Sequence, residues 1–171
     1  LDSQLAVNPV AITNVKKSST YYVGNEGEEK ALLTQNYDFN GITIKTSTVF
    51  NYSADTLDTS VTYKGIVTKQ EVLDSQLAAN PVAITNVKKS ITYYVGNESE
   101  EKALLTQNYD FNGINIKTST VFNYVSDTLD TSVTYKGIVT KQEVLDSQLA
   151  ANPVAITNVK KSITYYVGNE S

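Results

Sequence analysis

The sequence predicts an all-β chain of tandem β-sandwich domains, each about 72 residues long, and three observations lead to this prediction. Leu1–Val72 and Leu73–Val144 align without a gap and differ at only six positions, so the chain repeats itself. Each repeat contains short runs of Val, Ile, Thr and Tyr, which are residues typical of strands. Turn-forming residues interrupt these runs roughly every ten residues, a spacing typical of sandwiches and barrels.

The opening of a third copy follows the two full repeats. Residues 145–171 match 73–99 letter for letter, and we expect the chain to be a window from a longer array. A period of 72 residues exceeds the roughly 20–50 residues of a solenoid repeat, but it suffices for a small domain with its own core. The sequence therefore predicts domains at 1–72 and 73–144 and the first strands of a partial third at 145–171.

Short linkers are expected between the predicted domains. They cover about 1–8, 73–80 and 145–152. These segments are mostly polar and lack the Gly and Ser content of a flexible coil, so we expect a semi-rigid junction. If Leu73 and Leu77 pack into the junction, it becomes stiffer still.

Composition excludes several classes of function. The chain has no Cys and no His, so it has no disulfide framework, no thiolate metal site and none of the usual general bases. The net charge is −4, and nucleic-acid binding calls for a basic patch instead. No run of about 20 apolar residues is present, so the sequence predicts no membrane span in this segment.

The second repeat shows the expected elements in order. Val82–Val87 alternates apolar and polar residues and is predicted to be a strand. Ile91–Val95 and Ala103–Tyr109 are rich in β-branched, aromatic and aliphatic residues and are predicted to follow as strands. Asn112-Gly113 indicates a tight turn, because both residue types tolerate positive φ. Ile114–Phe122 is the next predicted strand.

The end of the repeat is predicted to be a loop and a hairpin. Asp127–Thr131 has loop composition, and Ser132–Tyr135 and Ile138–Val144 are expected to pair as strands around Lys136-Gly137. The only helical signal is in Asp74–Ala79, where the proline that follows leaves room for one turn at most.

The order of these motifs resembles a known family. The motifs are Tyr93-Tyr94-Val95-Gly96, Asn108–Gly113, Asp127–Thr131 and Val133–Gly137. Together they resemble the bacterial immunoglobulin-like (Big-type) tandem repeats of cell-surface and extracellular proteins. The resemblance implies immunoglobulin-like β-sandwich domains, an extracellular or cell-surface location, and no catalysis.

No catalytic, cofactor-binding or metal site is predicted. The carboxylate pairs Asp127 and Asp130, and Glu100 and Glu101, are expected to be solvated loop charges rather than an acid/base pair. The stretch beginning at Asn108 partly matches a calcium loop. The bidentate Glu of such a loop is replaced by Ser119, so we expect a hairpin turn there. No cofactor is expected, and the chain is predicted not to be an enzyme.

Three Asn-x-Ser triplets are candidate glycosylation sites, at Asn51, Asn97 and Asn169. Attached glycans are therefore possible partners. The near-identity of consecutive repeats indicates a structural segment of an extracellular fibre, stalk or filament, associating with itself end to end or laterally. Exposed strand edges, or strands donated by the third repeat, are the expected means of association. An adhesin module that binds a glycan or a host protein is the alternative.

Overall fold

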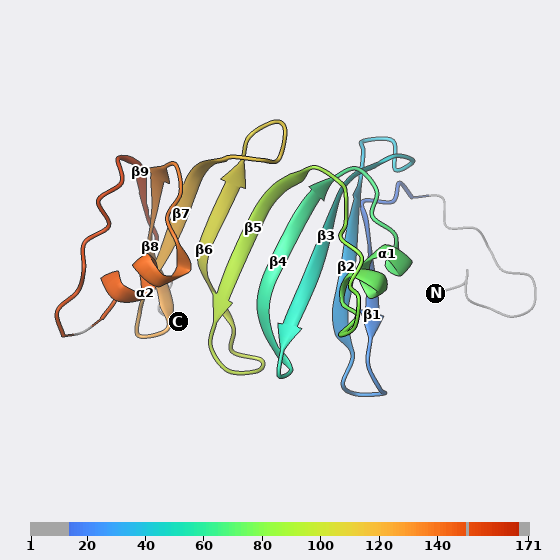
Figure 1. Ribbon diagram of the computed structural model, residues 1–171, viewed down its shortest axis with the longest axis horizontal. Coiled ribbons are helices and arrows are strands. Elements are labelled where there is room, and N and C mark those ends of the chain that lie inside the picture. Colours follow the sequence, from blue (N-terminus) through green and yellow to red (C-terminus); the bar gives the residue numbers. More distant parts are fainter. Residues whose placement is uncertain (1–13, 150, 168–171) are drawn as a thin grey trace, which may run out of the picture.

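In the residues that the structure describes, nine antiparallel strands form one continuous sheet and two short helices accompany it, which confirms the all-β class (Figure 1). This computed structural model describes residues 14–149 and 151–167. Strand order in the sheet equals chain order. The elements are β1 (Ser18–Val23), β2 (Lys30–Tyr37), β3 (Ile44–Ser53), β4 (Thr56–Lys64), α1 (Lys69–Ser75), β5 (Lys88–Val95), β6 (Lys102–Tyr109), β7 (Ile116–Val125), β8 (Thr128–Lys136), α2 (Lys141–Ser147) and β9 (Lys160–Tyr165).

Two-residue turns join β3 to β4 and β7 to β8. Ala54 and Asp55 both have positive φ, 45° and 69°, and the equivalent residues of the second repeat share this geometry. Positive φ at both central residues characterises the type I′ turn, whose twist matches that of the flanking strands. The predicted loop over Asp127–Thr131 is therefore wrong, because Thr128 already begins β8.

The predicted strand over Ile138–Val144 is also wrong, because this segment leads into the helix α2. The Oγ1 atom of Thr140 accepts a hydrogen bond from the backbone N–H of Glu143 at 3.2 Å. In return, the Glu143 carboxylate accepts one from the Thr140 N–H at 2.8 Å. This reciprocal pair is a capping box, and it matches the sequence Thr-x-x-Glu. Helix α1 begins in the same way after Thr68.

The predicted strand over Val82–Val87 is irregular chain in the structure. The N–H of Val82 donates to the carbonyl of Asp74 at 3.0 Å, which ties the segment back to the end of α1. The side chain of Ile84 packs against the hydrophobic core of the first repeat. The apolar alternation therefore reflects anchoring to the core, and not the pleat of a strand.

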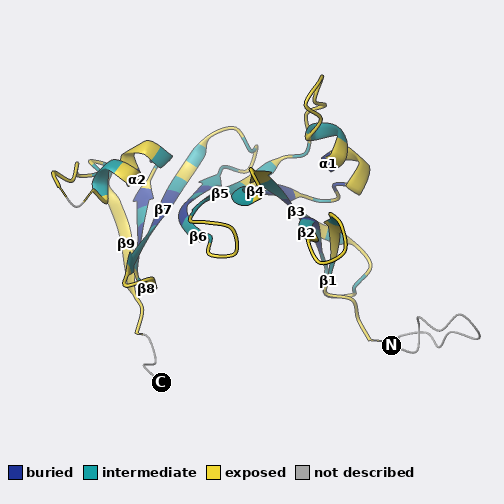
Figure 2. Cartoon of the chain, turned by 90° about the horizontal axis from the view of Figure 1, so that it is seen from below, coloured by how far each residue is buried: buried dark blue, intermediate teal, exposed yellow. Residues whose placement is uncertain are grey.

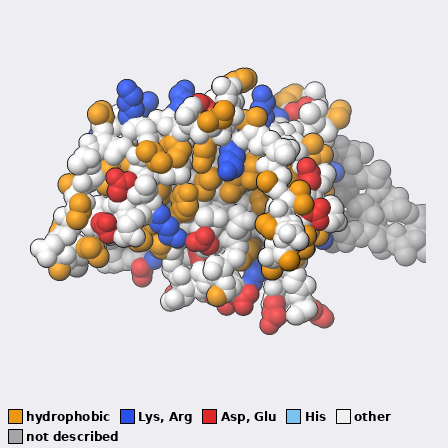
Figure 3. Space-filling view, in the orientation of Figure 1, with side chains coloured by type: hydrophobic (Ala, Val, Ile, Leu, Met, Phe, Trp, Pro, Cys, Tyr) orange, Lys and Arg blue, Asp and Glu red, His pale blue; other side chains and the backbone are white. Residues whose placement is uncertain are grey.

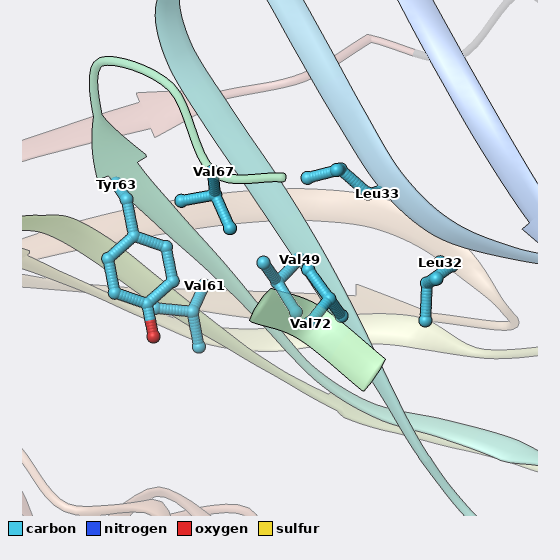
Figure 4. Close-up of a cluster of buried hydrophobic side chains, with 7 residues drawn as sticks. All are labelled: Leu32, Leu33, Val49, Val61, Tyr63, Val67 and Val72. Atoms are coloured by element: carbon cyan, nitrogen blue, oxygen red, sulfur yellow. The ribbon is translucent and has the colours of Figure 1, made fainter. Parts of the chain in front are cut away.

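The hydrophobic core of each repeat lies on one face of the sheet. In the first repeat it contains Leu32, Leu33, Val49, Val61, Tyr63, Val67 and Val72 (Figure 4), and the second repeat has the equivalent residues. Val67 and Val72 are both 0% exposed, and they come from α1 and the segment before it. The buried strand residues lie beneath these elements (Figure 2).

One open sheet takes the place of the two packed sheets expected of a sandwich. The described strands all belong to this sheet, and a short helix covers the core of each repeat. One strand that the sandwich would have needed is missing, because the capping box begins a helix in the segment predicted as the last strand. The opposite face carries cross-strand threonine pairs, such as Thr48 with Thr62 at 3.0 Å between their Oγ1 atoms.

The predicted domain boundaries at 72/73 and 144/145 fall inside α1 and α2. The sheet continues past the first boundary, because β4 pairs with β5. It continues past the second, because β8 pairs with β9. The division into independent domains stays a prediction.

Candidate functional site

The predicted glycosylation sites differ in their surroundings. Asn169 lies outside the described residues. Asn97 is exposed in the turn between β5 and β6. Asn51 is half-buried in β3, where its Nδ2 donates to Thr59 Oγ1 at 3.1 Å and its Oδ1 accepts from Gln76 Nε2 at 3.1 Å. A glycan on Asn51 would replace one of the two Nδ2 hydrogens of a half-buried amide that already contacts Thr59 and Gln76, whereas the side chain of Asn97 is accessible.

The second repeat provides an internal comparison for Asn51. Asn123 makes the same two hydrogen bonds, to Thr131 at 3.1 Å and from Gln148 at 3.2 Å. Asn123 is not part of an acceptor triplet, since Val125 stands two residues later. The amide at this position therefore has a structural role that is independent of any glycan.

Two of the carboxylates singled out in the sequence, Asp127 and Glu101, have partners in the structure. Asp127 forms an ion pair with Lys102 at 2.6 Å, and this contact lowers the pKa of Asp127. The Oδ1 atom of Asp110 accepts from the N–H of Ile114 at 3.0 Å, so the stretch predicted to be a hairpin turn is one. Within 14–149 and 151–167, no group of three or more His, Cys, Asp or Glu side chains is placed to hold a metal ion.

The most distinctive arrangement is the seam at which one repeat joins the next. Strand β4 of the first repeat pairs with β5 of the second, with Val61 opposite Ile91. Strand β8 pairs with β9 in the same register, with Val133 opposite Ile163. Ile91 and Ile84 pack against the core of the first repeat, although both come from the second copy in the sequence. Each core is therefore completed by the repeat that follows it.

Side chains also cross this first seam. The N–H of Leu57 donates to Glu101 Oε1 at 3.0 Å, and this hydrogen bond lowers the pKa of Glu101. The hydroxyl groups of Ser60 and Tyr94 lie 3.1 Å apart. Lys141 reaches back from α2 to form an ion pair with Asp58 in the first repeat at 3.0 Å. The seam thus combines apolar burial, backbone pairing and charge.

A polar clamp holds α1 on the sheet. Ser47 is 0% exposed, and its hydroxyl donates to the carbonyl of Gly65 at 2.8 Å. The same oxygen accepts from the N–H of Val67 at 2.9 Å. Gln35 Nε2 donates to the carbonyl of Val67 at 2.8 Å. The clamp satisfies the backbone at the point where the chain leaves β4, and the second repeat has an identical one at Ser119.

Sequence reasoning did not predict the seam or the clamp, although the sequence holds a signal for the seam and one for the helix that follows the clamp. One of the six differences between the repeats is Ser19 against Ile91, and Ile91 is a residue that lies in the seam. The Thr-x-x-Glu pattern at Thr68 and Thr140 signals a helix start, although the residues around it also have strand propensity.

Comparison with known proteins adds no family to this description. No protein-family model, no curated protein and no solved structure matches the chain. Neither helix of the described part is long and apolar enough to cross a membrane.

Proposed function

We propose that the chain is a non-catalytic structural repeat segment of an extracellular fibre or stalk, in which consecutive repeats share one sheet. The observation that carries the proposal is the pairing of β4 with β5 and of β8 with β9 in the same register. The extracellular location rests only on the motif order that resembles immunoglobulin-like repeats of bacterial surface proteins, because the single open sheet differs from their sandwich fold.

The seam suits a spacer because every further repeat lengthens the sheet by the same amount. Strands lie about 4.8 Å apart, so four strands add about 19 Å of sheet per repeat before twist is considered. Since each core takes residues such as Ile84 and Ile91 from the following repeat, neighbouring repeats stabilise each other. Such nearest-neighbour coupling is characteristic of repeat arrays and keeps them extended.

Coupling between repeats is tested by matched core substitutions in the full chain. Val49 and Val121 are equivalent and each is 2% exposed, so replacing either by Ala should cost about 2 kcal/mol. If the repeats share one cooperative structure, either substitution shifts a single urea transition by the same amount. Val125→Ala is the control, because Val125 is 62% exposed and should leave the transition unchanged.

The opposite result is equally clear. Independent domains on a tether would instead give two separate urea transitions, and only the transition of the substituted repeat would shift. The seam would then have no structural role, and the proposed spacer would be a series of independent domains joined by flexible linkers.

An adhesin module is the alternative proposal. It is favoured by the face of the sheet opposite the helices, where threonine pairs and the 56%-exposed Tyr22 offer hydroxyl groups and an aromatic ring. Saturable binding of a glycan to the isolated chain by calorimetry would support it. Removal of that binding by Tyr22→Ala would locate the site.

A further inference from the structure

Charge is divided between the two rims of the sheet. Because the strands are antiparallel and in chain order, odd-numbered strands begin, and even-numbered strands end, on the same rim. Ten of the fourteen lysines lie at this rim, here called the lysine rim. They are Lys16, Lys17, Lys45, Lys64, Lys88, Lys89, Lys117, Lys136, Lys160 and Lys161.

The other rim, here called the acidic rim, carries the opposite charge. Its ten carboxylates are Glu26, Glu28, Glu29, Asp55, Asp58, Glu98, Glu100, Glu101, Asp127 and Asp130. Figure 3 shows Lys side chains along its upper border and Asp and Glu side chains along its lower border. In the described part of the chain, the lysine rim holds only two acids, Asp38 and Asp110, and the acidic rim only two lysines, Lys30 and Lys102.

Apolar turn tips project from the lysine rim. Phe39 is 96% exposed and Ile42 is 80% exposed, in the turn between β2 and β3 at the top of Figure 1. The turn between β6 and β7 repeats them with Phe111 and Ile114, which are 83% and 75% exposed. In the first turn, Asp38 Oδ1 accepts from the N–H of Ile42 at 3.1 Å, so the tip is held in one shape. Preorganised apolar tips of this kind are suited to binding.

A cavity of about 1110 Å³ opens on the acidic rim, where the turns of consecutive repeats meet. Glu28 and Asp55 of the first repeat line it, together with Glu98 and Glu101 of the second. Tyr52 adds an aromatic surface to the wall, and burial raises the pKa of its hydroxyl. The cavity is as large as a typical pocket for a drug-sized molecule, roughly 300–1,000 Å³, and is large enough for a Phe side chain with its neighbours.

We propose that the lysine rim of one chain docks on the acidic rim of a second copy, with the Phe39 turn or the Phe111 turn entering the cavity of the acidic rim. The inference rests on the proposed function and specifies how fibres associate side by side. The two rims carry opposite charges. They also have complementary shapes, because apolar turns project from the lysine rim and a cavity opens on the acidic rim. The charged residues of both rims and the Phe turns recur with the same period of 72 residues, so one contact between rims places the next in register. The contact is heterologous because it joins two different rims, and a docked pair leaves one lysine rim and one acidic rim free, so the assembly extends into a layer.

A second copy explains both rims at once. An anionic membrane would engage the lysine rim and its apolar tips, but it would leave the acidic rim and its cavity without a partner. The charge interaction also predicts strong salt dependence, because the Debye length falls from about 10 Å at 0.1 M salt to about 3 Å at 1 M.

The experiment uses two charge-reversed forms of the full chain. The first carries Lys45→Glu and Lys117→Glu, equivalent positions on the lysine rim, and has a formal net charge of −8 in place of −4. The second carries Glu28→Lys and Glu100→Lys, equivalent positions on the acidic rim, and has a net charge of 0. Lys45→Arg with Lys117→Arg is the control that keeps the charge. Far-ultraviolet circular dichroism confirms that every form is folded.

Sedimentation velocity in 0.1 M salt then separates the outcomes. Wild type and the Arg control should form growing assemblies, and each reversed form alone should associate at least tenfold more weakly. An equimolar mixture of the two reversed forms should give one-to-one dimers, because one intact rim remains on each. Phe39→Ser with Phe111→Ser should weaken the wild-type assemblies without altering the melting temperature, since both side chains are exposed.

Three results would overturn the inference. The first is that wild type sediments as a single chain at all concentrations. The second is that the form with zero net charge associates more than wild type, which would indicate loss of repulsion instead of docking. The third is that wild type binds vesicles containing 30% phosphatidylglycerol while remaining a single chain in solution. In each case small-angle scattering of the single chain still reports on the shared sheet, so the proposed function is judged separately.

Discussion

Replacing Ser47 with Ala tests whether the buried clamp holds the helix on the sheet. Its hydroxyl makes two hydrogen bonds, to the carbonyl of Gly65 at 2.8 Å and from the N–H of Val67 at 2.9 Å. Ala removes both and leaves the Val67 N–H unpaired at a residue that is 0% exposed. An unpaired buried group costs about 1–3 kcal/mol, and a lost hydrogen bond adds about 1 kcal/mol. The expected loss of unfolding free energy is therefore about 3 kcal/mol.

Equilibrium urea unfolding measures this loss of free energy, and two matched variants serve as comparisons. Ser119→Ala removes the same two hydrogen bonds in the second repeat and should lose the same free energy. Thr48→Ala removes a part-buried hydroxyl on the opposite face of β3, paired with Thr62, and should cost about 1 kcal/mol or less. If Ser47→Ala costs no more than Thr48→Ala, the clamp is not what secures α1, and the reasoning from buried unpaired groups is wrong here.

Three further predictions concern pH, backbone conformation and modification. Hydrogen bonds from the helix N-cap lower the pKa of Glu71 below its ordinary 4.5, so its stabilising contribution is complete above pH 4.5 and is lost as the pH falls through the lower folded value. The difference in unfolding free energy between wild type and Glu71→Gln should therefore shrink between pH 7 and pH 3, and a constant difference would contradict this. Gly41→Ala should destabilise at least twice as much as Gly65→Ala in urea unfolding. Both residues have positive φ, +69° and +75°, but only at Gly41 does an added Cβ meet a neighbouring atom at 2.8 Å. In a host with an N-glycosylation pathway, peptide mapping by mass spectrometry should show a glycan at Asn97 and none at Asn51, and a glycan at Asn51 in folded protein would contradict this expectation.

Strand existence was predictable where local residues and tertiary contacts agree. Ile91–Val95 and Ala103–Tyr109 lie within β5 and β6, because their β-branched, aromatic and aliphatic residues suit a half-buried sheet. Val82–Val87 shows the limit of the same argument. Its alternation looks like a pleat, but only Ile84 reaches the core, and periodicity cannot separate a strand from a chain anchored at intervals.

The candidate site was less predictable than the fold. Asn51 and Asn97 belong to the same type of triplet, and only the position of Gln76 and Thr59 around Asn51 separates them. The two rims follow from an order of strands that the sequence does not state. Lysines at strand ends become one rim only when the strands pair in chain order and antiparallel.

By itself, the sequence determined the β-rich class, the 72-residue period and the lack of any thiol or imidazole chemistry, because these depend on composition and local pattern. Tertiary structure decided that the strands form one open sheet and that each repeat completes the core of the one before it. The physical reason is that strand pairing joins residues distant in the chain. The apolar face of the sheet is covered by a two-turn helix and not by a second sheet. This cover buries Val67 and Val72 against the sheet and pairs the N–H of Val67 with Ser47.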